Sequence, residues 1–436
     1  MTSTPKRVPI PRNGVDYRGK VVLAPMVRSG ELPSRLLALK YGADLVWGPE
    51  TVDRALIGTT RRINPTTSTI DFTRLPSNGS KTKNLAQKES LIYRLHPSLE
   101  HGRLIFQLGT SSPTRAVEAA RLVAADVVGI DINAGCPKPF STSGGMGAAL
   151  LRTPDLLCSI LEALVKEISP EFGIGISVKI RLLETPELTA NLVNRLCETG
   201  ITGLTIHCRT TPMRPRERAI RDQLRMIADI CHDHGVACLV NGDVESREHA
   251  MRLIEEFPID GAMLATSAES NPSCFRPAVE GGLLPWRTII TDYMSFALDV
   301  ENRFGNTKFT LGNLIPGKSV AYRKVTASKS YTDVCSVPEL ELDHLLPLAR
   351  VVDERLGIKS PDDCSADANA VVAAVAKAQG TNASARAAGG DMRRLKSPPA
   401  MSHQHPHSLA PQPTLSPSSE SSLIGQTCHG PASLST

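Results

Sequence analysis

Three polar side chains that could bind a ring-shaped ligand lie in runs of apolar residues. Gln107 lies in LIFQLG, Lys179 in GISVKIR and His207 in GLTIHCR. An amide, an ammonium and an imidazole without a cluster of carboxylates argue against metal-dependent hydrolysis and against glycosidase chemistry. They suit an electron-rich, anionic ring, so we expect a site for a polar organic ligand and no metal.

A cysteine in a loop accompanies these groups. Cys136 follows a strand-like run in DINAGCPKPF, between Gly135, which allows a sharp turn, and Pro137, which stiffens the chain. A thiol with an ordinary pKa of about 8.5 is protonated at pH 7 and can donate a proton unaided, whereas a nucleophilic cysteine needs a base. The neighbouring sequence offers no such base. A structural role for Cys136 is the alternative.

The runs that carry these residues recur between residues 20 and 282. Each is nearly continuous in apolar residues, as expected for a strand buried on both faces. The runs begin at Val21, Leu45, Leu104, Val127, Gly175, Gly203, Ala237 and Gly261. Eight strands alternating with helices over about 250 residues predict an α/β fold of the (β/α)8 TIM barrel type, with its active site at the carboxyl ends of the strands.

Helix signals separate several of the runs. Ser112, Thr153, Thr185 and Asn271 each precede a proline suited to the first turn of a helix. Gly200, after NRLCET, is typical of a helix end. These signals fit the helical half of the predicted barrel.

The ends of the last two strand-like runs predict a phosphate site. Backbone amides at Asn241-Gly242 and Ala265-Thr266 lie near expected helix starts, where such barrels usually bind phosphate. Combined with the ring-binding side chains, this predicts a site for flavin mononucleotide (FMN).

The chain divides into three parts by composition. We expect a barrel domain at 20–282, with a polar excursion at 64–102 between its second and third strands, and a small all-helical domain at 283–356. The segment 357–436 is rich in Ala, Ser, Pro, Gln and His and predicts a disordered tail.

The composition agrees with a globular protein. The chain has 436 residues, of which 41 % are apolar, and no apolar run approaches the length of about 18 residues that spans a bilayer. The N-terminus lacks a signal-peptide core, so we expect a cytoplasmic monomer without membrane contact, with nuclear entry left open. None of the ten cysteines forms a C-x-x-C pair, and the net charge of +5 is compatible with a polyanionic partner.

Several segments resemble the signature segments of the tRNA-dihydrouridine synthases. They are LAPMVRSGELPSRLLALKYGAD, FQLGT, DINAGCPKPFSTSGGMGAALL, VKIR, HCR and NGD. The resemblance runs from about Val21 to Ser273 and continues more weakly into NRFGNTKF. It is strongest to the eukaryotic members that modify uridine 20.

The resemblance implies an activity. It implies FMN-dependent reduction of a tRNA D-loop uridine, U20, to 5,6-dihydrouridine, with NADPH or NADH as transient reductant. A hydride would pass from flavin N5 to uracil C6, and Cys136 would be the general acid that protonates C5. The helical part would bind tRNA.

The resemblance also implies roles for the ring-binding residues. Pro25 and Met26 would lie against the flavin ring. Gln107, Lys179 and His207 would hydrogen-bond its polar edge, and Lys179 would stabilise negative charge on the reduced ring.

Further roles follow for the phosphate and the substrate. The flavin phosphate would be held by Asn241, Gly242, Ala265 and Thr266, although family members usually carry an arginine where this chain has Thr266. The residues implied to contact uracil or tRNA are Asn133, Arg181, Arg209 and Lys308, with further basic candidates at Arg214, Arg216, Arg287, Arg303, Lys318, Arg323, Lys324 and Lys329.

Two other functions remain open from the sequence. One is a flavin barrel enzyme that reduces a free pyrimidine, which would not need a basic helical domain. The other is an RNA-binding protein that has lost FMN and catalysis, suggested by Thr266 and opposed by the retention of Cys136, Lys179 and His207.

Overall fold

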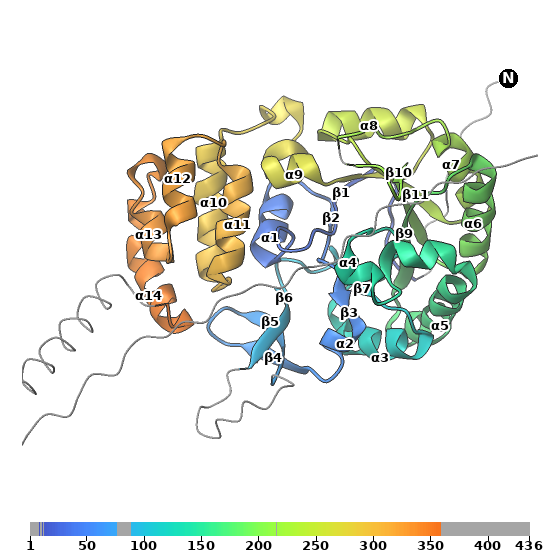
Figure 1. Ribbon diagram of the computed structural model, residues 1–436, viewed down its shortest axis with the longest axis horizontal. Coiled ribbons are helices and arrows are strands. Elements are labelled where there is room, and N and C mark those ends of the chain that lie inside the picture. Colours follow the sequence, from blue (N-terminus) through green and yellow to red (C-terminus); the bar gives the residue numbers. More distant parts are fainter. Residues whose placement is uncertain (1–7, 9–10, 12, 76–88, 215, 359–436) are drawn as a thin grey trace, which may run out of the picture. The chain divides into compact units, whose positions relative to one another are not determined.

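Eight parallel strands form a closed barrel at the centre of the computed structural model (Figure 1). The structure describes residues 8, 11, 13–75, 89–214 and 216–358. The barrel strands are β1 (Lys20–Leu23), β2 (Leu45–Trp47), β7 (Leu104–Gly109), β8 (Gly129–Asn133), β9 (Gly175–Leu182), β10 (Gly203–Thr210), β11 (Ala237–Asn241) and β12 (Gly261–Leu264). Pairing of β1 with β12 and of β2 with β7 closes the ring. The predicted (β/α)8 barrel is therefore confirmed.

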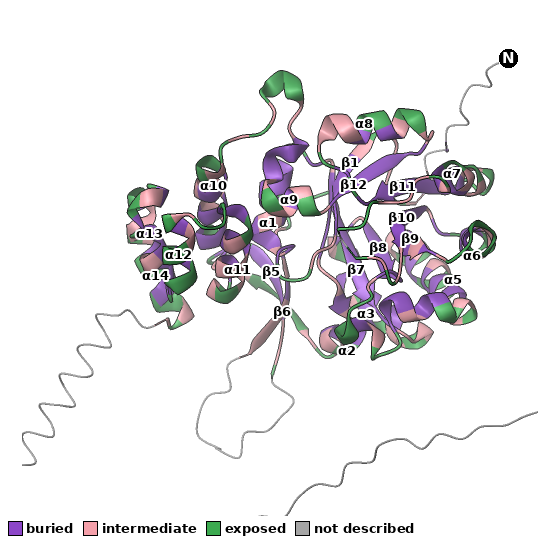
Figure 2. Cartoon of the chain, turned by 45° about the horizontal axis from the view of Figure 1, so that its top comes forward, coloured by how far each residue is buried: buried purple, intermediate pink, exposed green. Residues whose placement is uncertain are grey.

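The strands are buried because helices cover their outer face. Every residue of β8 and of β11 is buried, and Figure 2 shows the strands in purple inside the ring of helices. The longer covering helices are α1 (Leu32–Lys40), α3 (Pro113–Val123), α5 (Pro154–Phe172), α6 (Pro186–Glu198), α7 (Leu224–Asp233) and α8 (Arg247–Glu256). Short helices α2 (Asp53–Leu56), α4 (Pro139–Thr142) and α9 (Thr266–Ser270) lie in the loops after strands.

Most of the expected helix signals act as predicted. Ser112 caps α3 and Thr185 caps α6 through side-chain hydrogen bonds, and Gly200 follows α6 with a positive φ of 87°. Thr153 precedes α5 without a capping hydrogen bond. Asn271 caps a 3-10 turn at Pro272–Phe275 rather than an α-helix.

The expected excursion between the second and third barrel strands contains a small sheet. It is antiparallel, with order β4 (Thr60–Asn64), β5 (Thr69–Arg74) and β6 (Ser90–Leu95), and a two-residue strand β3 (Thr51–Val52) pairs with β7. The sheet holds together because Phe72 and Tyr93 are buried register partners, and the Tyr93 ring packs edge-on against Phe106 of the barrel.

A second hydrophobic core lies in the C-terminal helices. These are α10 (Trp286–Asp299), α11 (Phe304–Leu314), α12 (Val320–Ala327), α13 (Tyr331–Cys335) and α14 (Leu346–Leu356). Their core includes Leu37 of α1 and Tyr41 directly after this helix, and the Tyr41 hydroxyl donates a 2.6 Å hydrogen bond to Asp292. The barrel helix α1 thus packs against the C-terminal helices, beside α10 and α11 (Figure 1).

The predicted tail falls outside the described residues from position 359 onward. In the part of the chain that the structure describes, no helix is both long enough and apolar enough to cross a membrane.

Candidate active site

A cavity of about 320 Å³ opens at the carboxyl ends of the barrel strands. Ten of the predicted site residues line it: Pro25, Met26, Gln107, Asn133, Cys136, Lys179, Arg181, His207, Asn241 and Ala265. Four other predicted residues, Gly242, Thr266, Arg209 and Lys308, are not among its lining residues. The barrel geometry thus brings together side chains that are up to 240 positions apart, from Pro25 to Ala265.

Lys179 of β9 is held in the cavity by the side-chain amide of Asn241 on β11, two strands away in the barrel. Its ammonium donates a 3.0 Å hydrogen bond to Asn241 Oδ1, and the Asn241 amide donates to the carbonyl of Met263. Burial and, to a lesser degree, the neighbouring Arg181 lower the pKa of Lys179 to about 8. At neutral pH Lys179 is therefore mostly an ammonium group fixed in the cavity. At mildly alkaline pH it loses its proton.

His207 is a neutral donor. Burial and three nearby cations, the closest in sequence being Arg209, hold the pKa of His207 far below its usual value. Arg209 Nη1 lies 3.2 Å from His207 Nε2. Because a guanidinium only donates hydrogen bonds, Nε2 must be the acceptor and Nδ1 must carry the proton. The imidazole therefore keeps one N–H, at Nδ1, for a ligand acceptor.

Arg209 supports this arrangement from the interior. It is only 5 % exposed, donates to the carbonyl of Glu217 and forms an ion pair with Asp243. Gly242, at φ +110°, packs so closely that a Cβ there would lie 3.2 Å from His207 Cδ2. A side chain at position 242 would therefore press on the imidazole.

Gln107 is oriented by a buried carboxylate that the sequence analysis did not single out. Its side-chain nitrogen donates a 2.8 Å hydrogen bond to Asp131 Oδ2, and Ser177 Oγ donates to Asp131 Oδ1 at 2.7 Å. The three residues are register partners on adjacent strands β7, β8 and β9. Because Asp131 only accepts while ionised, the amide nitrogen of Gln107 faces it and the amide oxygen is left for a donor in the cavity.

The loop after β8 carries Cys136 in a fixed position. Asn133 Oδ1 accepts hydrogen bonds from the backbone amides of Gly135 (3.0 Å) and Cys136 (3.1 Å). Arg181 Nε donates a 2.7 Å hydrogen bond to the carbonyl of Gly135. Both side chains predicted to face the uracil therefore also shape the turn that presents the cysteine.

Cys136 differs from the other cysteines in its exposure. Of the eight cysteines in the described residues, it alone is partly exposed and the other seven are buried. Partial burial, with a contribution from Glu50, raises the pKa of the Cys136 thiol, while Lys138 and Arg181 oppose that rise. The thiol is therefore protonated at neutral pH and suited to donate a proton.

Glu50 is a cavity residue that the sequence analysis missed. It lies just after β2 in the sequence WGPE, and its Oε1 accepts a 2.8 Å hydrogen bond from Ser141 Oγ. The available signal was an acidic residue three positions beyond a buried strand. Burial raises the pKa of Glu50, opposed by the nearby side chains of Ser141 and Asn133.

Comparison with known proteins supplies the family. The dihydrouridine synthase (Dus) family model matches residues 22–308. The chain belongs to the dihydrouridine synthase family.

Two yeast members of the dihydrouridine synthase family are close in sequence. The chain is 50 % identical over 336 residues to the tRNA-dihydrouridine(20) synthase [NAD(P)+] of Schizosaccharomyces pombe, covering 76 % of this chain and 67 % of that protein. It is 46 % identical over 330 residues to the Saccharomyces cerevisiae protein of the same name, covering 74 % and 84 % respectively. The tRNA-dihydrouridine(20a/20b) synthase of S. cerevisiae is 28 % identical over 258 residues.

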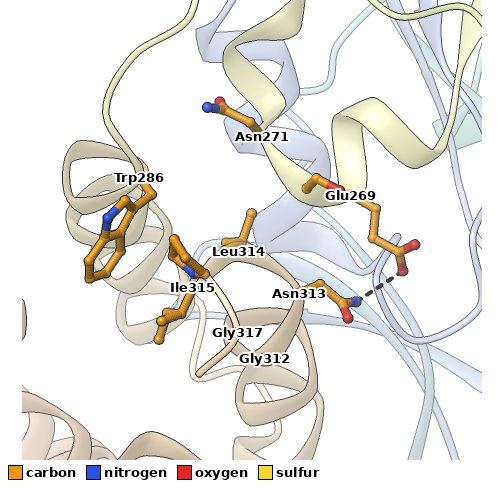
Figure 3. Close-up of a pocket in the computed structure, with 10 residues that line it drawn as sticks. Glu269, Asn271, Trp286, Gly312, Asn313, Leu314, Ile315 and Gly317 are labelled. Carbon is orange, nitrogen blue, oxygen red and sulfur yellow. Dashed lines mark hydrogen bonds between the residues drawn. The ribbon is translucent and has the colours of Figure 1, made fainter. Parts of the chain in front are cut away.

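A second pocket in this dihydrouridine synthase lies between α9 and the C-terminal helices. Its volume is about 530 Å³, and Glu269 lines both this pocket and the active-site cavity. Figure 3 shows Trp286 on one side and, on the other, Asn313, whose side-chain amide donates a 3.1 Å hydrogen bond to Glu269. Glu269 is the lining residue that the two pockets share.

Several of the predicted RNA-binding side chains already have partners within the protein. Lys308 donates a 2.8 Å hydrogen bond to the carbonyl of Ser328, and Lys324 forms an ion pair with Glu339. The Arg287 guanidinium lies 4.6 Å from the centre of the Trp286 ring. These contacts hold the basic groups on the surface of the helical part, where their role toward RNA stays a prediction.

Proposed function

We propose that this protein uses FMN and NAD(P)H to reduce a uridine in the D-loop of tRNA, at position 20, to 5,6-dihydrouridine. The observation that carries the proposal is the convergence of Lys179, neutral His207 and protonated Cys136 on one cavity of a dihydrouridine synthase barrel. The names of the two yeast relatives support both the substrate and the nicotinamide reductant.

The residues of the cavity fit an FMN ring. A volume of about 320 Å³ lies at the lower end of the range of about 300–1,000 Å³ typical of ligand cavities. Gln107 offers an amide oxygen, Lys179 an ammonium and His207 a neutral N–H, a set that complements a ring carrying both donors and acceptors. Bound there, FMN would supply the hydride that uracil C6 requires.

The same side chains define how the ring would be held. Gln107, Lys179 and His207 would bind its polar edge, with Pro25 and Met26 against its face. The Lys179 ammonium would stabilise negative charge in the cavity. Asn241, Gly242, Ala265 and Thr266 would hold the phosphate end through backbone amides and the Thr266 hydroxyl, without the arginine usual in the family.

Cys136 would complete the reduction as the general acid. Its thiol is protonated at neutral pH and lies on the mouth side of the cavity, beside the exposed residues Pro137 and Lys138. It would give its proton to C5 of the uracil, and solvent would reprotonate the thiolate. No base is required for a thiol that is already protonated.

Recognition of the base would fall to the residues around this loop. Asn133 and Arg181 line the cavity and would contact the uracil, while Lys308 would act toward the tRNA. Arg209, which is buried against His207 and Asp243, would act through these neighbours. Because a stacked base cannot enter the cavity, the uridine must leave its stack, which costs least in a loop.

The proposal is tested by single-turnover kinetics. Protein reconstituted with FMN is reduced anaerobically with NADPH and then mixed with an unmodified tRNA transcript, the same transcript with cytidine at position 20, or free uridine. We expect rapid reoxidation only with the first. Equal reoxidation by free uridine would indicate a free-pyrimidine reductase, and failure to retain FMN would contradict the proposal.

A further inference from the structure

Glu50 occupies the junction between two barrel strands and the cysteine loop. It follows β2, and a Cβ at Gly109, the last residue of β7, would lie 2.5 Å from Glu50 Oε1. The absence of a side chain at position 109 is therefore what allows the Glu50 carboxyl group to lie between these strands. From there it reaches the loop that presents Cys136.

The contact with that loop runs through a buried hydroxyl. Ser141 is fully buried in α4, and its Oγ donates a 2.8 Å hydrogen bond to Glu50 Oε1. Gly147 closes the other side, because a Cβ there would lie 2.5 Å from both Ser141 Oγ and the carbonyl oxygen of Cys136. The backbone of Cys136 and the hydroxyl that binds Glu50 are thus packed against the same glycine.

The second carboxyl oxygen of Glu50 has no evident structural use. Oε2 is buried and makes no hydrogen bond in the geometry of the described residues, while the side chains of Ser141 and Asn133 both favour the ionised form of the carboxyl group. Burying an unpaired carboxyl oxygen is unfavourable, and a residue that served packing alone would not need one. The charge of the carboxylate acts on the groups around it, which include the thiol of Cys136.

We propose that Glu50 is a positioning residue for Cys136: it anchors the cysteine loop through Ser141, and its negative charge keeps the thiol in the protonated form that donates to substrate. The proposal rests on the proposed role of Cys136 as general acid. The charged groups that face the thiol are Glu50 beyond β2, Lys138 on the same loop, and Arg181 and Lys179 on β9. Three of the four are cations that favour thiolate, and Glu50 is the one carboxylate that opposes them.

Two variants separate the anchor from the charge. Glu50→Gln keeps an oxygen that can accept from Ser141 and removes the charge, whereas Ser141→Ala removes the hydrogen bond and keeps the charge. Glu198→Gln changes an exposed carboxylate at the end of α6 and serves as the matched control. Glu50→Ala removes both functions.

The first measurement is alkylation of Cys136 by iodoacetamide as a function of pH, quantified by peptide mass spectrometry on the whole chain. With Glu50→Gln, alkylation at pH 7 should rise by a factor of roughly three to ten and its midpoint should fall to lower pH, because the thiolate loses a repulsive neighbour. Glu198→Gln should keep the wild-type midpoint, and Ser141→Ala should shift it less than Glu50→Gln does. An unchanged profile for Glu50→Gln would overturn the electrostatic part of the proposal.

The second measurement is the rate at which the reduced holoenzyme converts uracil in tRNA. Ser141→Ala and Glu50→Ala should lower it by at least about ten-fold, since a displaced loop misplaces the acid. Glu50→Gln should retain most of the rate at pH 7. As the pH is raised above 7, its rate should begin to fall at a lower pH than the rate of the wild type. Wild-type rates in Ser141→Ala and Glu50→Ala would overturn the anchoring part.

The two measurements also distinguish failure of this proposal from failure of the proposed function. Alkylation needs neither tRNA nor FMN. A shifted alkylation midpoint in a protein that reduces no tRNA uridine would support the Glu50–Cys136 coupling while contradicting the assigned reaction.

Discussion

Replacing Asp131 with asparagine should change how the stability of the protein depends on pH. Asp131 is fully buried, and burial raises its pKa from 3.8 to about 6 despite hydrogen bonds from Gln107 and Ser177. A raised pKa in the folded state means that the protonated form stabilises folding. That contribution is complete below pH 3.8 and is lost as the pH rises through about 6, at a total cost of roughly 3 kcal/mol.

The variant Asp131→Asn cannot ionise, so it should escape this loss. Between pH 4.5 and pH 7.5 the wild type should lose about 2 kcal/mol through this group. The difference in unfolding free energy between variant and wild type should therefore move by about 2 kcal/mol in favour of the variant over that interval. An asparagine presents one oxygen to two donors, and that penalty does not depend on pH, so it cancels from the comparison.

The assay is urea unfolding of the FMN-free protein, followed by circular dichroism at both pH values. Asp229→Asn, which alters an exposed carboxylate on α7, is the matched control and should show no such movement. A pH-independent difference between Asp131→Asn and wild type would refute the reasoning that Asp131 is ionised at a cost in the folded state.

Three further predictions concern catalysis and stability. Cys136→Ala should leave reduction of bound FMN by NADPH within about two-fold of wild type and slow uracil reduction by roughly 10²–10⁴, measured as separate half-reactions; equal losses in both would contradict the general-acid role. Lys179→Met should make the midpoint potential of bound FMN more negative, measured by dye equilibration, because the cation that favours the anionic reduced ring is gone; an unchanged potential would contradict its role. Arg35→Met should destabilise the protein by about 3–5 kcal/mol in urea unfolding. The reason is that Glu100, which Arg35 binds through two hydrogen bonds of 2.6 and 3.1 Å, would keep its buried charge without a cation. Adding Glu100→Gln should recover part of the loss.

The barrel and most of its cavity were predictable from the sequence. Eight apolar runs indicated eight buried strands, and the residues at their ends meet because parallel strands present their carboxyl ends on one side. Lys179, His207 and Cys136 could be grouped on this basis before their contacts were known. The sheet β4–β6 was less predictable, because its first strand is exposed and polar and only short stretches such as Ile70 and Phe72 face inward.

The residues that tune the site were not predictable from local pattern. Asp131 lies in the apolar run GIDIN, and its function depends on Gln107 and Ser177, which reach it only through strand register. The position of the Glu50 carboxyl group depends on the hydroxyl of Ser141, which is 91 positions away in the sequence, and on the absence of a side chain at Gly109. Such contacts are set by tertiary structure, so the sequence offers at most an unexpected polar residue as a signal.

We propose that Cys136, Lys179 and His207 together serve the reduction of one uridine in tRNA. The most direct test is nucleoside mass spectrometry, with mapping of position, on an unmodified tRNA transcript incubated with the protein, FMN and NADPH. We expect a mass gain of two hydrogen atoms at uridine 20 with wild-type protein and almost none with Cys136→Ala. A gain at another position or none at all, with FMN bound and reducible, would contradict it.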